Sequence, residues 1–220
     1  VTPAPTPVVT PAPTPVVTPA PTSPPVGIAV PTSIDATGAT DASAALNTWL
    51  ATVPDGSTIV FKAGGTYRMD HGLKVRNRHD LVFEGNGATL SSNPATASIE
   101  SDSLIALWGG NSRITIRNFH FVGNSDKPGV YQGTLKEGVH AVLIQGDDVE
   151  IHDVTVRGMY GDAFHIHESG TSTGWSNNTW IHDSRVYSTG RNGVTVIAGQ
   201  NAIIERVAFD TIGYSTLDIE

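Results

Sequence analysis

Residues 151–166 read IHDVTVRGMYGDAFHI, residues 181–196 read IHDSRVYSTGRNGVTV, and residues 204–219 read IERVAFDTIGYSTLDI. The three segments align without gaps, and apolar side chains coincide at three positions. Those positions hold Val156, Val186 and Phe209, then Phe164, Val194 and Leu217, and then Ile166, Val196 and Ile219. The segments begin 30 and 23 residues apart, at 151, 181 and 204. Apolar residues at a fixed phase, with a period in this range and variable insertions, predict a solenoid.

The apolar runs of the rest of the chain are short, as strands require. Residues 58–61, 81–83, 104–107, 114–116 and 142–144 are such runs, and Gly, Asn and Asp separate them. Short apolar runs between turn residues are typical of β-strands. In a β-solenoid, inward side chains stack on their equivalents about 4.8 Å away in the next coil. The sequence therefore predicts an all-β chain built from coils of parallel strands.

One helix is expected near the start of this solenoid. Apolar residues recur at helical spacing between Ala42 and Val53, Thr40 or Asp41 can cap the helix, and residues 54–56 end it. A solenoid exposes a strand edge at each end, and an amphipathic helix is a common cover for such an edge. We expect this helix to close the N-terminal end, with Trp49 packed in the cap.

A family resemblance follows from residues 34–90. This stretch holds Gly-Ala-Thr-Asp, the expected helix, GSTIVFKAGGTY at 56–67 and FEGNGAT at 83–89. It resembles the N-terminal part of the pectin-lyase-like superfamily, and the resemblance extends over about residues 34–220. The resemblance implies a right-handed parallel β-helix. It leaves the chemistry open, because this superfamily includes pectate and pectin lyases, polygalacturonase-like hydrolases, alginate-modifying enzymes and non-catalytic tailspikes and adhesins.

The composition divides the chain into two parts. Residues 1–31 hold 11 of the 14 prolines and no charged residue, and an eight-residue Pro/Thr repeat occurs there three times. This composition predicts a disordered, extended linker of the kind found in extracellular proteins. Residues 32–220 are expected to form the β-helix domain. Because residues 214–220 match a complete core strand, we expect further coils downstream and a domain truncated at its C-terminus.

Charge and hydropathy exclude several classes of protein. The net charge is −8 and the chain has four lysines, which argues against a nucleic-acid-binding surface. No run of about 18 apolar residues is present, so a membrane-spanning segment is not expected. The chain has no cysteine, which excludes thiol catalysis and cysteine-bound zinc.

The repeat alignment places a set of polar side chains on one outer face. Outward positions beside Phe164 and Ile166 hold His165 and His167, and the aligned positions in later coils hold Thr195, Ile197, Asp218 and Glu220. Just before these strands, Asp162, Asn192 and Ser215 align, and the preceding coil offers His140, Leu143 and Gln145. The candidate catalytic residues are Asp162, His165, His167, Glu168 and Asp218.

Three chemistries suit this face. Inverting hydrolysis needs two carboxyl groups about 6.5–9.5 Å apart, and two coils separate Asp162 or Glu168 from Asp218 by about 9.6 Å. A lyase needs a base, for which His165 or an arginine is suitable, and a group such as Ca²⁺ on Asp162, Glu168 or Asp218 to neutralise a uronate carboxylate. A transition metal on His165, His167 and a carboxylate is the third possibility. The identity of any metal stays open.

Two insertions supply candidate substrate-binding residues. Residues 169–178 form an extra loop that carries Trp175, and residues 124–138 form a second one that carries Lys136. Exposed aromatic rings in such loops can stack on sugars. Lys136 and Arg191 are cations suited to an acidic sugar, and Asn192, which follows Arg191 in the chain, is a further candidate for substrate binding.

Two functions remain in competition at this stage. The first is a secreted polysaccharide lyase or glycoside hydrolase that cleaves an acidic, uronate-containing polymer. The second is a non-catalytic extracellular module of the adhesin or tailspike type that binds glycans. The polymer and the oligomeric state are left open.

Overall fold

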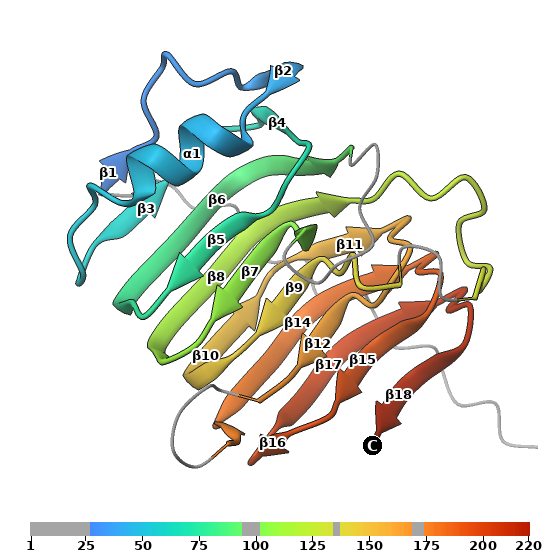
Figure 1. The fold of residues 1–220 in the computed structure, drawn as a ribbon. Helices are drawn as coiled ribbons and strands as arrows, with labels where there is room; N and C mark the ends of the chain where they lie inside the picture. The colour runs from blue at the N-terminus through green and yellow to red at the C-terminus, as the bar shows by residue number, and fades with distance from the viewer. Residues whose placement is uncertain (1–26, 94–101, 134–136, 169–173) are drawn as a thin grey trace, which may run out of the picture.

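The computed structural model describes residues 27–93, 102–133, 137–168 and 174–220. Within these residues the chain winds as a parallel β-helix, in which the strands of successive coils stack side by side (Figure 1). Every strand pairing is parallel. Among the described residues no helix has the length and apolar character needed to cross a bilayer.

One side of each coil belongs to a six-stranded sheet. Its strands, in spatial order, are β5 (Leu73–Arg76), β7 (Ile105–Trp108), β9 (Val142–Ile144), β12 (Phe164–Ile166), β15 (Asn192–Val196) and β18 (Ser215–Ile219). The registers pair Phe164 with Val194 and Val194 with Leu217. These are the pairings that the gapless alignment predicts, so the predicted phase of the repeat is confirmed.

The other sides form a ten-stranded sheet. Its strands are β1 (Ile28–Ala29), β2 (Thr37–Asp41), β3 (Thr58–Val60), β4 (Thr66–Met69), β6 (His79–Ser92), β8 (Asn111–Val122), β10 (Gly146–His152), β11 (Thr155–Arg157), β14 (Thr179–Tyr187) and β17 (Ile203–Asp210). A separate pair consists of β13 (Ser176–Asn177) and β16 (Gly199–Gln200). The aligned positions Val156, Val186 and Phe209 pair as expected.

The ten-stranded sheet bends at a column of residues with left-handed backbone. Asn86, Asn118, Asp153, Asp183 and Arg206 occupy this corner with φ between 46° and 57°. Asn and Asp tolerate this conformation better than most residues. Arg206 is the exception, and its guanidinium binds the carboxylate of Asp183 in the preceding coil, with Nε 2.7 Å from Oδ1. The corner divides each coil into flat faces that point in different directions.

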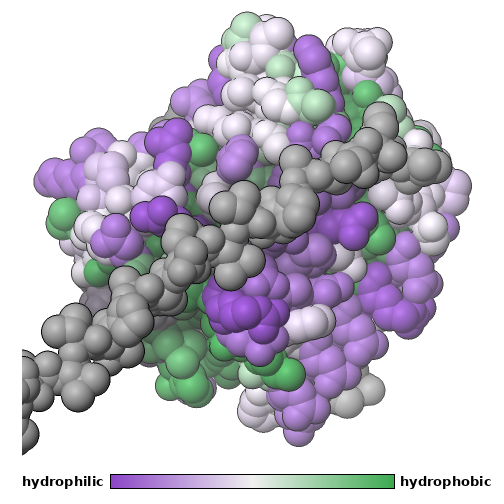
Figure 2. Space-filling view, turned by 180° about the vertical axis from the view of Figure 1, so that it is seen from behind, coloured by the Kyte–Doolittle hydropathy of each residue, from purple (hydrophilic) through white to green (hydrophobic). Residues whose placement is uncertain are grey.

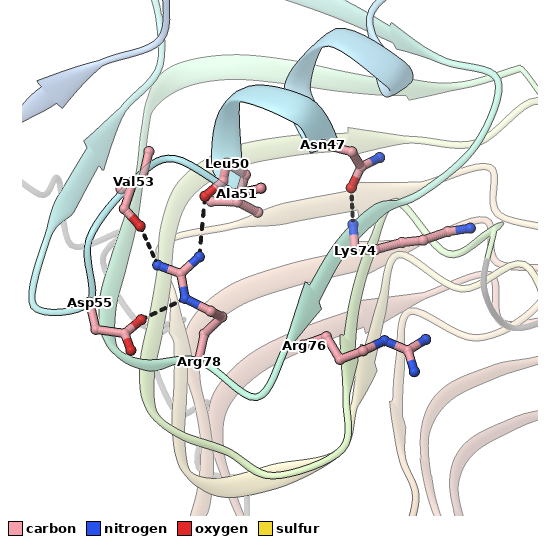
Figure 3. Close-up of a pocket in the computed structure, with 8 residues that line it drawn as sticks. All are labelled: Asn47, Leu50, Ala51, Val53, Asp55, Lys74, Arg76 and Arg78. Carbon is pink, nitrogen blue, oxygen red and sulfur yellow. Dashed lines mark hydrogen bonds and ion pairs between the residues drawn. The ribbon is translucent and has the colours of Figure 1, made fainter.

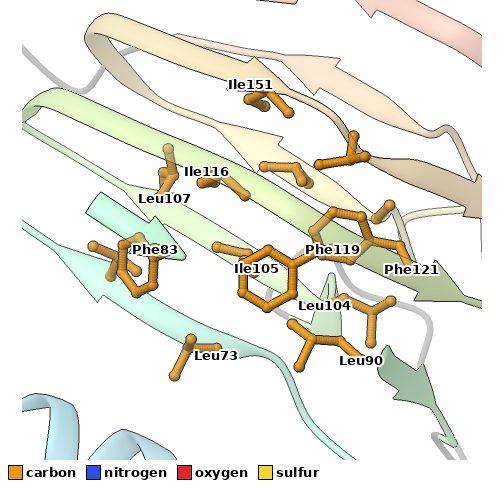
Figure 4. Close-up of a cluster of buried hydrophobic side chains, with 14 of the residues drawn as sticks. Leu73, Phe83, Leu90, Leu104, Ile105, Leu107, Ile116, Phe119, Phe121 and Ile151 are labelled. Atoms are coloured by element: carbon orange, nitrogen blue, oxygen red, sulfur yellow. The ribbon is translucent and has the colours of Figure 1, made fainter. Parts of the chain in front are cut away.

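Inward side chains form the hydrophobic core. Phe83, Ile116, Ile151 and Ile181 are in register across four coils, and all four are fully buried. Figure 4 shows the first three of them among the buried side chains. Phe119 stacks on Phe121 with ring centroids 5.6 Å apart. Figure 2 shows the molecule from behind, where hydrophilic residues cover most of the surface and hydrophobic atoms gather most densely along one lower edge. The apolar positions of the sequence repeat are therefore the inward-facing positions of the strands.

The helix α1 (Ser43–Leu50) is shorter than the expected 40–53. It cannot begin earlier because the preceding residues form β2, which pairs with β4. Asp41 Oδ1 accepts the backbone N–H of Ser43 at 2.9 Å, although Asp41 precedes the helix cap. Leu46 and Leu50 enter the core and Trp49 packs against it, as expected for this tryptophan.

Arg78 fastens the end of α1 to the first coil. Its guanidinium donates to the carbonyl oxygens of Leu50, at 3.2 Å, and of Val53, and it binds the Asp55 carboxylate (Figure 3). The backbone N–H of Lys74 in β5 also donates to Asn47 Oδ1 at 2.7 Å. These bonds line a hollow of about 520 Å³ between the helix and β5.

The leader lies mostly outside the described residues, which begin at 27. β1, which falls within the range assigned to the linker, pairs with β3 through Ile28–Ile59 and Ala29–Val60. Val30 and Ile34 are buried in the core. The last residues of the Pro-rich range therefore belong to the first coil.

Candidate functional site

His165 projects from the outer face of the six-stranded sheet. Its register partners are Leu143 on β9 and Thr195 on β15, and Thr195 pairs in turn with Asp218 on β18. This is the column of outward residues that the alignment predicts. His165 is nevertheless only 2% exposed, and Leu143 and Thr195 are fully buried. The column is therefore a covered surface of the sheet.

A ladder of polar side chains runs beside this column, at the corner before each strand. Ser103 Oγ accepts the backbone N–H of His140 at 3.3 Å, and His140 Nδ1 accepts that of Asp162 at 3.0 Å. Asp162 Oδ1 accepts the N–H of Asn192 at 2.9 Å, and Asn192 Oδ1 accepts that of Ser215 at 3.2 Å. Each side chain thus satisfies a backbone donor of the next coil, which is why these polar groups can be buried.

The second oxygen of Asp162 faces the outward column. Oδ2 lies 2.8 Å from His165 Nδ1, 2.9 Å from Thr195 Oγ1 and 3.7 Å from Arg191 Nη1. Burial raises the pKa of this carboxyl, but its histidine neighbours, the hydrogen bond from His165 and the charge of Arg191 outweigh burial and leave the pKa below its ordinary value. Asp162 is therefore an ionised carboxylate surrounded by donors.

This contact sets the tautomer of His165. Because an ionised carboxylate can only accept, Nδ1 of His165 carries a proton, and in the neutral form of the ring Nε2 presents a lone pair. Nε2 is buried and has no hydrogen-bond partner within the described part of the chain. An imidazole whose Nδ1–H a carboxylate holds in this way is the arrangement of a general base.

His140 stacks a neutral ring against His165. The ring centroids are 4.3 Å apart and the planes are 12° from parallel. Burial lowers the pKa of His140 to about 3, so the ring is uncharged near neutral pH. Since Nδ1 accepts a backbone N–H, the proton of His140 is on Nε2, which also lacks a partner among the residues that the structure describes.

Asn192 and Asp218 belong to the same network. Asn192 Nδ2 lies 2.8 Å from Thr195 Oγ1 and 3.0 Å from Asp218 Oδ2, so this amide links the two strands. Arg191 lies at the edge, where Nη2 is 3.2 Å from Glu220 Oε1 and 18% of the side chain is exposed. The structure thus brings Asp162, His165, Asn192, Arg191 and Asp218 together.

The other expected residues are less closely connected. The ring of His167 lies 5.6 Å from that of His165. Glu168 is exposed, and Trp175 is 47% exposed. No hydrogen bond or ring contact between described residues joins Glu168 or Trp175 to Asp162, and Lys136 lies outside the described residues.

His140 and Thr195 are functional candidates that the sequence analysis placed on this face without choosing them. The signal for His140 was the register, because it precedes Asp162 by 22 residues, as Val142 precedes its partner Phe164. Thr195 is the direct register partner of His165. Both side chains contact Asp162, and neither contact can be predicted from the residue type or from the local sequence.

The side chains around Asp162 are poorly suited to bind a metal ion. His140, Asp162 and His165 each place a ligand atom within 4.8 Å of the other two. However, both Nδ1 atoms already make hydrogen bonds, and the Asp162 oxygens face donors from Asn192, Thr195, His165 and Arg191. Ca²⁺ requires six to eight oxygen ligands. The residues present around Asp162 do not supply them.

Comparison with known families agrees with this architecture. A family model described as "Rhamnogalacturonase A/epimerase, pectate lyase-like" matches residues 31–217. The chain belongs to this pectate lyase-like family. No curated protein gives a significant match to the chain.

The match of the pectate lyase-like family covers both the coils and the Asp162 network. The matched range begins at residue 31, just after Ile28 and Val30, and it ends at Leu217 in β18. A carbohydrate-active role follows from the family at a coarse level. The particular reaction depends on the side chains of this chain.

Proposed function

We propose that this pectate lyase-like protein cleaves a uronate-containing polysaccharide by β-elimination, with His165 as the base. One observation carries the proposal: Asp162 Oδ2 holds His165 Nδ1 at 2.8 Å and leaves Nε2 unpaired among the described residues. A carboxylate that holds one nitrogen of an imidazole leaves the other to accept a proton, and because Nε2 is buried, a substrate reaches it only when the groups that cover it move.

The reaction starts at the carbon next to the uronate carboxylate. Nε2 of His165 takes the proton from C5, and the electron pair of that C–H bond forms the C4–C5 double bond. The C4–O bond breaks, its electrons stay on the leaving oxygen, and the imidazolium returns the proton to that oxygen. The negative charge of Asp162 stabilises the imidazolium that forms between these steps.

Arg191 is suited to bind the substrate carboxylate. Removal of the C5 proton places negative charge on this carboxylate, and a nearby cation stabilises that charge. Arg191 makes one 3.2 Å contact with Glu220 and lies 3.7 Å from Asp162, so its five N–H donors are not all used by these two acids. Trp175 and Lys136 remain proposed sugar contacts in the loops.

Hydrolysis is less well supported by the same carboxylate. A hydrolase needs one protonated carboxyl to serve as the acid and one carboxylate to serve as base or nucleophile. Asp162 is fully buried, its pKa is lowered, and four neighbouring groups face its oxygens. Asp162 is therefore unsuited to either part, which leaves Glu168 as the other expected partner of Asp218.

The setting of this activity is also part of the proposal. We infer a secreted or cell-surface protein, because a Pro/Thr-rich leader without charges is typical of extracellular spacers. We also propose that α1 closes the first coil, since Leu46 and Leu50 enter the core and Arg78 binds the helix end.

A glycan-binding scaffold without catalysis is the second candidate. The ladder favours it, because Ser103, His140 and Asn192 make the same bond as Asp162 Oδ1. The burial of His165 also favours it. In that case the Asp162–His165 contact is part of the packing of the coil.

Incubation with polygalacturonate, alginate and other uronate polymers separates the two candidates. We expect unsaturated ends on at least one polymer, with and without a calcium chelator, and their loss in His165→Gln. His120→Gln is the matched control, since His120 lies on β8 of the other sheet with Nδ1 2.7 Å from Thr155 Oγ1. Binding without any unsaturated ends would support the scaffold.

A further inference from the structure

A second cluster of rings lies on the outer face of the ten-stranded sheet, away from His165. Trp180 and His182 on β14 stack with centroids 3.8 Å apart and planes 27° from parallel. His182 stacks in turn on His152 of β10, at 5.0 Å and 6°. The three rings form a continuous platform across two coils.

Hydrogen bonds hold this platform rigidly. Trp180 Nε1 donates to Glu205 Oε1 at 3.1 Å. His182 contacts Asp183 Oδ2 through Nδ1 at 2.7 Å and Glu150 Oε1 through Nε2 at 3.2 Å. A fixed ring loses little conformational freedom when a ligand stacks on it.

One face of the Trp180 indole borders a hollow of about 380 Å³. Along the direction of the strands, the hollow comes just ahead of the level of His182. Its lining residues are Asp148, Val149, Glu150, Asn178, Thr179, Trp180, Asn201 and Ile203. His182 stacks on one face of the Trp180 indole, and the same indole is part of the lining of the hollow. Trp180 is 37% exposed and Ile203 is 54% exposed.

A row of amides forms the rim of this hollow. Asn178 Nδ2 donates to Asp148 Oδ1 at 2.8 Å, and Asn201 Nδ2 donates to Asn178 Oδ1 at 3.1 Å. These bonds orient the amides along the solenoid axis. Each amide has two donors and a carbonyl oxygen, so hydrogen-bonding capacity remains for the hydroxyl groups of a ligand.

The charges around the hollow select the class of ligand. Asp148 and Glu150 line it, and Glu205 binds the indole. Arg206 and Arg113 are the neighbouring cations. Arg206 is paired with both Asp183 and Glu205, and Arg113, beside Asp148, is paired with Asp80. The acidic surroundings disfavour a uronate, whereas an uncharged sugar ring with an apolar face suits the indole.

We propose that the Trp180 hollow binds a neutral saccharide. The sugar ring stacks on the free face of the indole and its hydroxyls bond to Asn178 and Asn201. This site lies on a different sheet from His165 and does not depend on the proposed elimination. It gives the protein a second contact with its polymer, at neutral sugars instead of uronates.

Affinity electrophoresis of the full chain in gels that contain neutral polysaccharides tests the proposal. Galactan, arabinan, xylan and mannan are the neutral probes, and polygalacturonate is the acidic one. We expect retardation by at least one neutral polymer, about ten-fold weaker affinity in Trp180→Ala, and partial retention in Trp180→Phe.

Tyr187→Ala is the matched control, because Tyr187 is an aromatic residue of the same strand that packs against Arg185 outside the hollow. It should bind as the unaltered chain does. The proposal is overturned if no neutral polymer retards the protein, or if Trp180→Ala and Tyr187→Ala bind equally well. Unsaturated ends formed from polygalacturonate, which offers no neutral sugar to the Trp180 hollow, keep this result separate from the elimination.

Discussion

Asp162 Oδ2 lies 2.8 Å from Nδ1 of His165, while Oδ1 of the same carboxylate accepts the backbone N–H of Asn192 in the next coil. The two oxygens therefore have separable roles. One maintains the stacking of the coils, and the other fixes the tautomer of an imidazole. A substitution that spares one oxygen can distinguish the structural role from the proposed catalytic one.

Asp162→Asn should reduce activity strongly and stability only moderately. Asparagine keeps an Oδ1 acceptor for Asn192, as Asn192 itself does for Ser215, but it removes the charge that supports His165. We expect a loss of about 10²–10⁴-fold in kcat, the range of a missing acid–base contribution. Asp162→Ala should also lower the free energy of unfolding by about 1–3 kcal/mol, because a buried N–H loses its acceptor. Equal unfolding energies for the two variants would contradict the assignment of Oδ1.

His140 should behave mainly as a structural residue. Replacement by Phe removes the acceptor of the Asp162 N–H, so we expect a loss of about 1–3 kcal/mol in urea unfolding. His140→Asn should recover much of it, because asparagine makes this same bond from position 192. If the phenylalanine variant is as stable as the unaltered chain, the ladder bond at His140 is unimportant.

Stability should fall as the pH falls from about 6.5 to about 3. The pKa of His140 is about 3 in the folded chain against 6.5 ordinarily, so the unfolded chain binds an extra proton in this window. The contribution of neutral His140 to the free energy of unfolding is therefore lost as the pH falls through this window, at up to about 1.4 kcal/mol per pH unit. The lowered pKa of Asp162 adds a loss in the same direction below its ordinary value of 3.8. Urea unfolding of His140→Asn should show a shallower slope in the window, and an unchanged slope would refute the attribution.

The inward column should be most sensitive where it is fully enclosed. Ile151 is completely buried between Ile116 and Ile181, whereas Ile204 in the same column is half-buried. Ile151→Ala should cost about 2–5 kcal/mol and Ile204→Ala less, because the cavity is smaller where the side chain is already near solvent. Thermal or urea unfolding of the pair measures this difference. A larger loss at Ile204 would contradict the register.

The repeat in the sequence predicted the coils because the inward side chains must all be apolar. Val156, Val186 and Phe209 differ in shape, yet they share a phase, and this phase became the observed register. The helix was overextended because helical spacing around Leu46 does not reveal that residues 37–41 pair as a strand. Strand pairing over long distances overrode the local pattern.

The site was predicted in part for a similar reason. His165 followed from the outward phase of its strand, and Asp162 followed from the aligned position just before that strand. The ladder could not be found by residue type, because Ser103, His140, Asp162 and Asn192 make one bond with four different side chains. Any short acceptor satisfies that corner, so the sequence shows no repeated residue there. The contact between Thr195 and Asp162 likewise depends on a register that insertions obscure.

Release of deuterium from C5 of a uronate polymer into water tests the central claim most directly. The unaltered protein and His120→Gln should release it as unsaturated ends form, and His165→Gln should be slower by about 10²–10⁴-fold. Circular dichroism and urea unfolding should show that His165→Gln is folded. New reducing ends without deuterium release, or equal release by His165→Gln and the unaltered protein, would contradict the account.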